Sequence, residues 1–196
     1  FAHAVPEDLS GKTVLDIGCN GGFYSMEMKK RGAARVLGVD WDEDYLAQAR
    51  FAAEVTGLDI EFRKLSVYDV GALGERFDVV LALEIVEHVA DPASFIATCR
   101  DLVRPGGLVI LSTLNRTARS FGAAIIGAEW VLRWLPRGTH DWARFLTPDE
   151  LAAMAEGAGL TVADRRGMVF NPLTFGWSLS DRDLSVNYIM TARRDA

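Results

Sequence analysis

The stretch VLDIGCNGG, residues 14–22, ends an apolar run in an acid and a set of glycines. Glycines let a ligand approach the backbone closely, and a strand that leads into such a turn is typical of a nucleotide site. The nicotinamide pattern G-x-G-x-x-G, started at Gly18, needs glycines where this chain has Asn20 and Phe23. The turn is therefore predicted to bind a nucleotide-bearing ligand of another kind.

A second acid, Asp40, ends the apolar stretch RVLGVD at residues 35–40. A carboxylate at the end of the second strand of a parallel sheet can accept both hydroxyls of a ribose, and ligands of such sheets lie beyond the carboxyl ends of the strands. The alternative is that the glycines only make a tight turn and that Asp40 caps a helix. The cofactor-binding residues predicted at these ends are Asp16, Gly18, Cys19, Asn20, Gly21, Asp40, Trp41 and Leu83.

The stretch EIVEH places Glu84, Glu87 and His88 at positions i, i+3 and i+4 after an apolar strand. One helical turn could bring the three side chains to one face, where they could act as a base or bind Mg²⁺, Mn²⁺ or Zn²⁺. The alternative is that Glu87 and His88 cap a helix start or form a salt bridge there. His140, in the stretch GTHDW, is the other candidate base, with Asp141 able to orient it, although a loop histidine is more often only solvated.

These residues lie between strands and helices that alternate along the chain. Apolar runs predict strands, and periodic apolar positions with capping signals predict helices. The alternation implies an α/β fold with a doubly wound parallel sheet, and the capping signal TPDE precedes the last helix. Strands are expected at 13–17, 35–40, 60–65, 77–83, 108–113, 161–165 and 186–193, and helices at 23–31, 44–56, 91–103 and 147–158.

Composition is that of a globular protein, because 49% of the 196 residues are hydrophobic and 24% are charged. The formal net charge of −6 argues against nucleic acid as a partner. Cys19 and Cys99 form no metal spacing and no disulfide framework, so a reducing, cytoplasmic location is expected. We see no bilayer-spanning apolar run and no signal peptide, and expect a single domain over 1–196.

Four motifs in register resemble the class I S-adenosylmethionine (SAM)-dependent methyltransferases: VLDIGCNGG, VLGVD, FDVVLALEIVEHV and LVRPGGLVILST. The resemblance implies a seven-stranded Rossmann-like sheet of order 3-2-1-4-5-7-6, with strand seven antiparallel. It also implies that the glycine turn holds the methionine part of SAM and that Asp40 binds the ribose. The adenine would be lined by Ser66, Val67 and Leu83.

The second half of the chain resembles the ubiquinone-biosynthesis O-methyltransferases through EIVEHV, STLNRT, GAEWVLRWLPRGTHDW, FLTPDEL, FNPLT and VNYIM. The resemblance implies O-methylation of polyprenylated phenols and catechols, including 3-demethylubiquinol. It also implies a metal site at Glu84, Glu87 and His88 in some members of the family. The glycine turn departs from that family, which normally has G-C-G-G-G where this chain has G-C-N-G-G. A neutral phenol has a pKa near 10 and needs a proton acceptor, for which Glu84, His88 and His140 are the candidates.

An insert at about 115–145 interrupts the alternation and should cover the active site. It holds five arginines (116, 119, 133, 137 and 144) against Glu129 and Asp141, a net charge of 5 − 2 = +3. Its apolar residues would share one helical face, as in a helix that lies on an anionic membrane surface. These apolar positions are Phe121, Ala124, Ile125, Ala128, Val131, Leu132 and Leu135, and Trp130 and Trp134 lie near the opposite side. A lid packed on the domain is the other interpretation.

Three functions are compatible with these features. The first is O-methylation of a phenolic quinone precursor, by an enzyme peripheral to the inner membrane. The second is methylation of another small molecule, with the second half of the chain retained as a scaffold. The third is an inactive module that binds the cofactor and assists the assembly of a quinone-synthesis complex, against which the intact glycine turn and Asp40 argue.

Overall fold

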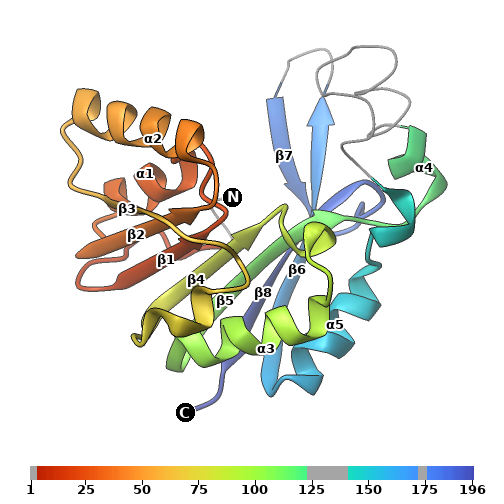
Figure 1. The fold of residues 1–196 in the computed structure, drawn as a ribbon. Helices are drawn as coiled ribbons and strands as arrows, with labels where there is room; N and C mark the ends of the chain where they lie inside the picture. Colours follow the sequence, from red (N-terminus) through yellow and green to blue (C-terminus); the bar gives the residue numbers. More distant parts are fainter. Residues whose placement is uncertain (1–3, 123–140, 172–175) are drawn as a thin grey trace.

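The computed structural model describes residues 4–122, 141–171 and 176–196. Its described strands form one eight-stranded sheet of order β3-β2-β1-β4-β5-β8-β6-β7 (Figure 1). The strands are β1 (Thr13–Ile17), β2 (Arg35–Asp40), β3 (Glu61–Lys64), β4 (Phe77–Leu83), β5 (Val103–Leu114), β6 (Leu160–Asn171), β7 (Gly176–Ser180) and β8 (Asn187–Arg194). The α-helices are α1 (Phe23–Lys30), α2 (Glu43–Thr56), α3 (Pro92–Leu102), α4 (Ala118–Ser120) and α5 (Pro148–Gly157).

The five strands from β3 to β5 are parallel, and β8, β6 and β7 add antiparallel pairs. The predicted α/β methyltransferase sheet is confirmed, including the last strand of the chain between β5 and β6. The strand β7, at the far edge, was not predicted. Because β6 runs to Asn171 rather than to residue 165, its last five residues, from Gly167, pair with β7, and the first two of these also pair with β8.

Alternating side chains of the parallel strands pack into two apolar layers, one on each face of the sheet. In β1, Leu15 and Ile17 pack in the cluster that includes the apolar faces of α3 and α5, whereas Val14 packs in the cluster that includes Met28 of α1. Figure 1 shows α1 and α2 on the opposite side of the sheet from α3 and α5. The polar residue Asp16 has the same parity as Val14, so it faces α1.

Short polar side chains begin four of the described α-helices, including Thr117 at α4. Asp42 accepts from the backbone N–H of Asp44 at 2.9 Å, and Asp91 accepts from that of Ser94 at 3.1 Å. Thr147 and Glu150 form the capping box that the sequence predicted for the last helix. These caps fix the loops that leave the carboxyl ends of the strands.

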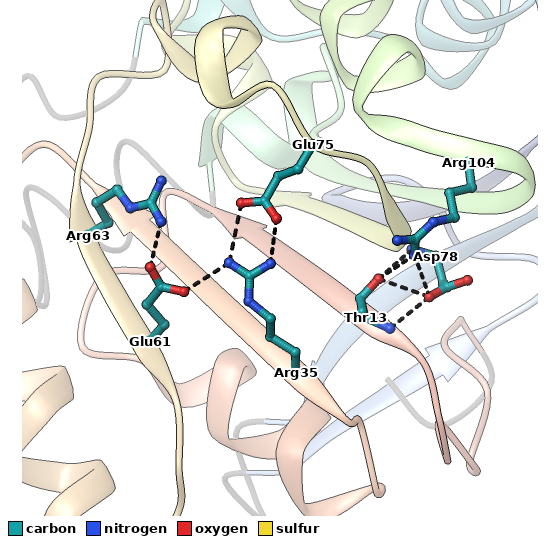
Figure 2. Close-up of polar contacts among 7 residues, drawn as sticks. All are labelled: Thr13, Arg35, Glu61, Arg63, Glu75, Asp78 and Arg104. Atoms are coloured by element: carbon teal, nitrogen blue, oxygen red, sulfur yellow. Dashed lines mark hydrogen bonds and ion pairs between the residues drawn. The ribbon is translucent and has the colours of Figure 1, made fainter.

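The opposite, amino-terminal edge of the parallel strands is tied by ion pairs (Figure 2). Arg35, the first residue of β2, pairs with Glu75 at 2.5 Å and with Glu61 of β3 at 2.9 Å. Asp78 accepts from the backbone N–H of Thr13 at 2.8 Å and pairs with Arg104 at 2.8 Å. This network joins the starts of neighbouring strands, away from the predicted ligand edge.

No helix in the described ranges is long and apolar enough to span a membrane.

Candidate functional site

The turn after β1 is attached to the end of β2. The backbone N–H groups of Gly18 and Cys19 both donate to the carbonyl of Val39, at 2.8 and 3.0 Å. One Asp40 oxygen accepts from the backbone N–H of Asn20 at 2.9 Å, and the other accepts from that of Asp42 at 3.0 Å. An ionised carboxylate has about four acceptor sites, so Asp40 keeps capacity for two further hydroxyls.

Asn20, where the chain departs from the family's usual glycine, has left-handed backbone with φ of 49°. Its side-chain oxygen accepts from the N–H of Gly21 at 2.6 Å, a local bond of the type that lets asparagine adopt this conformation. Left-handed non-glycine residues cost free energy and are concentrated at functional sites. Asparagine at position 20 therefore adopts the left-handed conformation that a glycine would adopt more easily.

The three glycines of the turn have different roles. A Cβ at Gly18 would lie 2.6 Å from Cδ1 of Ile85, and one at Gly22 would lie 2.9 Å from Ala49 and from Phe62. A Cβ at Gly21 would meet no heavy atom within 4 Å. Gly18 and Gly22 are thus required by packing and by positive φ, whereas Gly21 leaves room beside the backbone for a ligand.

Asp16 lies beneath this turn, almost completely buried, and accepts a hydrogen bond from the Ser25 hydroxyl at 2.6 Å. Burial raises the pKa of Asp16 to about 6, the charge of Asp40 adds to the rise, and hydrogen bonds from Ser25 oppose it. A buried carboxyl with a pKa this close to neutrality would become fully ionised beside a bound cation.

The other predicted cofactor residues lie at or just after the carboxyl ends of the parallel strands. The backbone N–H of Leu65 donates to the carbonyl of Asp40 at 2.8 Å, which brings the segment after β3, with the half-buried Ser66 and Val67, to this edge. Trp41 is 69% exposed. Leu83 ends β4 and is buried, as is Cys19, whose thiol pKa is raised by burial first and by Asp16 next.

Glu84 follows β4 in a strained conformation, with φ of 52°. The Ser112 hydroxyl accepts from the Glu84 backbone N–H at 3.0 Å and donates to its carboxyl at 2.8 Å, so one side chain holds both ends of the residue. Asn187 donates to the other carboxyl oxygen at 3.4 Å. Burial, followed by repulsion from Glu87, raises the pKa of Glu84. Glu84 is therefore a held carboxyl whose raised pKa makes it a stronger proton acceptor than a solvated glutamate.

Glu87 is buried, and one of its oxygens accepts from the Thr113 hydroxyl at 2.8 Å. Its other oxygen, Oε1, has no hydrogen-bond partner within the described part of the chain. Burial raises the pKa of Glu87 as well. The neighbouring residues Ser112 and Thr113 thus bind one carboxyl each of the pair Glu84 and Glu87.

The helical turn expected to align Glu84, Glu87 and His88 does not form, and this prediction is wrong. A 3-10 helix spans only Val86–His88, because Glu84 in left-handed backbone precedes it. His88 as a whole is exposed to solvent. What burial its ring has, followed by the charge of Arg144, lowers the pKa of His88. No group of three or more His, Cys, Asp and Glu side chains in the described residues is arranged to hold a metal ion. The predicted metal set therefore does not fit, and we derive no step through a metal.

His140 lies outside the described residues. Its neighbour Asp141 caps the short turn Trp142–Arg144 by accepting from the N–H of Ala143 at 3.0 Å. The sequence did not point to four residues that hydrogen-bond the acids of the site. Ser25 binds Asp16, Thr113 binds Glu87, and Ser112 and Asn187 bind Glu84. The motif STLN begins at Ser112, and the position of Ser112 and Thr113 at the carboxyl end of β5 was the available signal.

The fold and the turn with its two acids define a class I SAM-dependent methyltransferase. The sequence model of a family described as "Methyltransferase domain" matches residues 1–164. In its fold the chain is similar to a magnesium protoporphyrin IX methyltransferase from Synechocystis PCC 6803, solved with bound SAH. The TM-score is 0.67 at 21% identity, over 95% of this chain and 75% of that one.

Curated relatives are much nearer in sequence. The chain is 53% identical to a ubiquinone biosynthesis O-methyltransferase of Cereibacter sphaeroides, over 97% of this chain and 77% of the relative. A protein of the same description from Dinoroseobacter shibae matches at 53% over the same shares. The chain belongs to the ubiquinone biosynthesis O-methyltransferase family, which confirms the predicted resemblance.

Proposed function

We propose that this protein transfers the methyl group of SAM to a phenolic hydroxyl of a ubiquinone precursor. The observation that carries the proposal is 53% identity, over 97% of the chain, to ubiquinone biosynthesis O-methyltransferases. The geometry supports it, because a nucleotide-type turn and a held carboxyl lie at the ends of neighbouring strands β1 and β4.

The residues at the carboxyl edge fit SAM. Asp40 has acceptor capacity left for the ribose hydroxyls, and Gly21 leaves room beside the backbone. Asp16 offers a carboxylate to the ammonium group at the amino-acid end of SAM, and Ser66, Val67 and Leu83 would line the adenine. When bound, SAM supplies an electrophilic methyl group on a cationic sulfur.

The acceptor phenol must lose its proton as its oxygen bonds to the methyl group. Glu84 is the candidate proton acceptor that the geometry favours, because Ser112 and Asn187 fix its carboxyl and burial raises its pKa. The proton would pass from the phenol oxygen to Glu84 Oε and then to solvent. His88, whose lowered pKa keeps it neutral, is the second candidate, and His140 is the third.

Transfer of labelled methyl from SAM to a panel of phenols and catechols tests the proposal. We expect transfer to catechols related to 3-demethylubiquinol and little transfer to unrelated acceptors. Transfer only to another class of small molecule would favour the second function given above, and SAM binding without transfer would favour an assembly module. Activity should persist in excess chelator, since the described residues present no three-ligand set. Loss of activity that Mg²⁺ restores would place a metal at the Glu84 and Glu87 pair.

The insert at about 115–145, which follows β5, would bring the enzyme to its polyprenylated substrate at a membrane surface. At its two described ends, the exposed rings of Phe121 and Trp142 contact each other edge to face at 6.4 Å between ring centroids. Arg119 pairs with Asp183 there. Arg133 and Arg137 lie outside the described residues and remain the predicted contacts with anionic lipid.

Cosedimentation with liposomes tests this membrane contact. Binding should need anionic lipid, weaken with salt, and fall when Arg133 and Arg137 become glutamate. A protein that stays in the supernatant with anionic liposomes at low salt would make the segment a lid only. A water-soluble phenol would then be the better substrate.

A further inference from the structure

Ser25 is a polar side chain at the site to which the proposed chemistry gives no role. It is the third residue of α1 and is completely buried, at 0% exposure. Its hydroxyl donates to Asp16 Oδ2 at 2.6 Å, between α1 and the end of β1. A buried hydroxyl that donates to a buried carboxyl is a strong, charge-assisted contact when that carboxyl is ionised.

The space for this hydroxyl is provided by a glycine of the neighbouring strand. Gly38 of β2 is directly beside Asp16 in the parallel register. A Cβ at position 38 would lie 2.9 Å from the Ser25 hydroxyl and 2.7 Å from Cδ1 of Phe62. Gly38, Phe62 and Ser25 therefore form a tightly packed support that fixes the position of the hydroxyl.

We propose that Ser25, seated in the space left by Gly38, is a positioning residue that holds the Asp16 carboxylate for the ammonium group at the amino-acid end of SAM. The inference rests on the proposed function, because it requires that SAM bind at this turn. It adds a residue that acts through Asp16 and that would not itself touch the cofactor.

The proposal has a signature in the pH dependence of SAM binding. Burial raises the pKa of Asp16 to about 6, hydrogen bonds from Ser25 oppose the rise, and the charge of Asp40 adds to it. Burial raises the pKa of Cys19 beside the turn and of Tyr24 on α1, and the charge of Asp16 adds to the rise of each. A bound cation favours the ionised carboxyl, so SAM affinity should fall as the pH drops through about 6.

Removal of the hydroxyl should move this fall to higher pH. In Ser25→Ala the pKa of Asp16 rises, by about one unit for one lost hydrogen bond to a charged group. The ratio of wild-type to variant SAM affinity should then be about fivefold larger at pH 6 than at pH 8. A serine that serves only to pack α1 would lower the unfolding temperature and leave the pH midpoint of SAM binding unchanged.

The test is calorimetric titration of SAM into the full chain between pH 5.5 and 8. Ser120→Ala is the matched control, because Ser120 is equally buried and hydrogen-bonds the carbonyl of Asn115, away from Asp16. Asp16→Asn removes the titrating group, so it should abolish the fall near pH 6 and make the Ser25→Ala change nearly silent. If Ser25→Ala does not fold, Ser25→Cys, a weaker donor, should show a smaller shift in the same direction.

The outcomes separate the two levels of the argument. Equal pH midpoints in wild type and a folded Ser25 variant overturn the role of Ser25 and leave the proposed function standing. Wild-type protein that binds no SAM at any pH overturns the proposed function, and with it this inference.

Discussion

Gly21 and Gly18 offer a pair of variants that distinguishes a ligand cradle from a structural turn. A Cβ at Gly21 would meet no heavy atom within 4 Å, and its φ lies outside the left-handed region. Gly21→Ala should therefore change the free energy of unfolding by no more than about 0.5 kcal/mol, or stabilise the fold slightly through the unfolded chain. The proposed site has SAM approach the backbone at this position, so SAM affinity should fall at least about tenfold.

Gly18→Ala should mainly destabilise the fold. Gly18 has φ of +72°, and its Cβ would lie 2.6 Å from Cδ1 of Ile85. The left-handed conformation alone costs about 1–2 kcal/mol for a non-glycine residue, and displacement of Ile85 adds to it. About 2 kcal/mol corresponds to a melting temperature lower by about 4–8 °C in a chain of this size.

Thermal unfolding of the two variants without ligand, followed by calorimetric titration with SAM, measures both effects. Gly21→Ala with wild-type SAM affinity and wild-type stability would refute the assignment of this turn as the cradle. A large loss of stability in Gly21→Ala would refute the packing argument instead.

Three further predictions concern the acids and the opposite edge of the sheet. Asp40→Ala should weaken SAM binding by roughly 1–3 kcal/mol in calorimetry. The control Asp42→Ala, which removes the nearby helix cap, should leave SAM affinity unchanged. Wild-type SAM affinity in Asp40→Ala would remove Asp40 from the site. Ser112→Ala should lower kcat about tenfold at unchanged SAM affinity, because the lost hydroxyl holds Glu84. Ser112→Thr, which keeps a hydroxyl, should restore kcat. A wild-type kcat in Ser112→Ala would contradict the role of this hydroxyl. Arg35→Ala should destabilise the fold by about 1 kcal/mol near pH 7 without changing SAM affinity. Hydrogen bonds from Arg35 lower the pKa of Glu75 below its ordinary 4.5, so this difference should vanish as the pH falls through that lowered value; a difference that persists at pH 2 would contradict it.

The parallel half of the sheet could be predicted because local signals agreed there. Residues 13–17, 35–40 and 77–83 match β1, β2 and β4 in both bounds, since each apolar run is bracketed by polar or turn residues. β7 escaped prediction because Gly176–Ser180 alternates apolar and polar residues over only five positions, and it gains its partners only from the long β6.

The site was predicted as a location more than as an arrangement. Asp16, Asp40 and Glu84 follow from the rule that ligands lie beyond the carboxyl ends of parallel strands. Their contacts depend on residues far away in sequence, as when Ser112 and Asn187 meet Glu84 across the sheet. The positive φ of Glu84 also has no local sequence signal, because glutamate rarely adopts it.

The central claim is tested most directly by incorporation of labelled methyl from SAM into a catechol of the 3-demethylubiquinol type, compared between wild type and Glu84→Gln. The account predicts that wild type transfers one methyl group to one hydroxyl of the catechol. Glu84→Gln, which keeps the hydrogen bond from Ser112 but cannot accept the proton, should bind SAM normally and transfer methyl much more slowly. Wild-type protein that binds SAM and methylates no catechol would contradict the proposed function. Full activity in Glu84→Gln would contradict the role of Glu84.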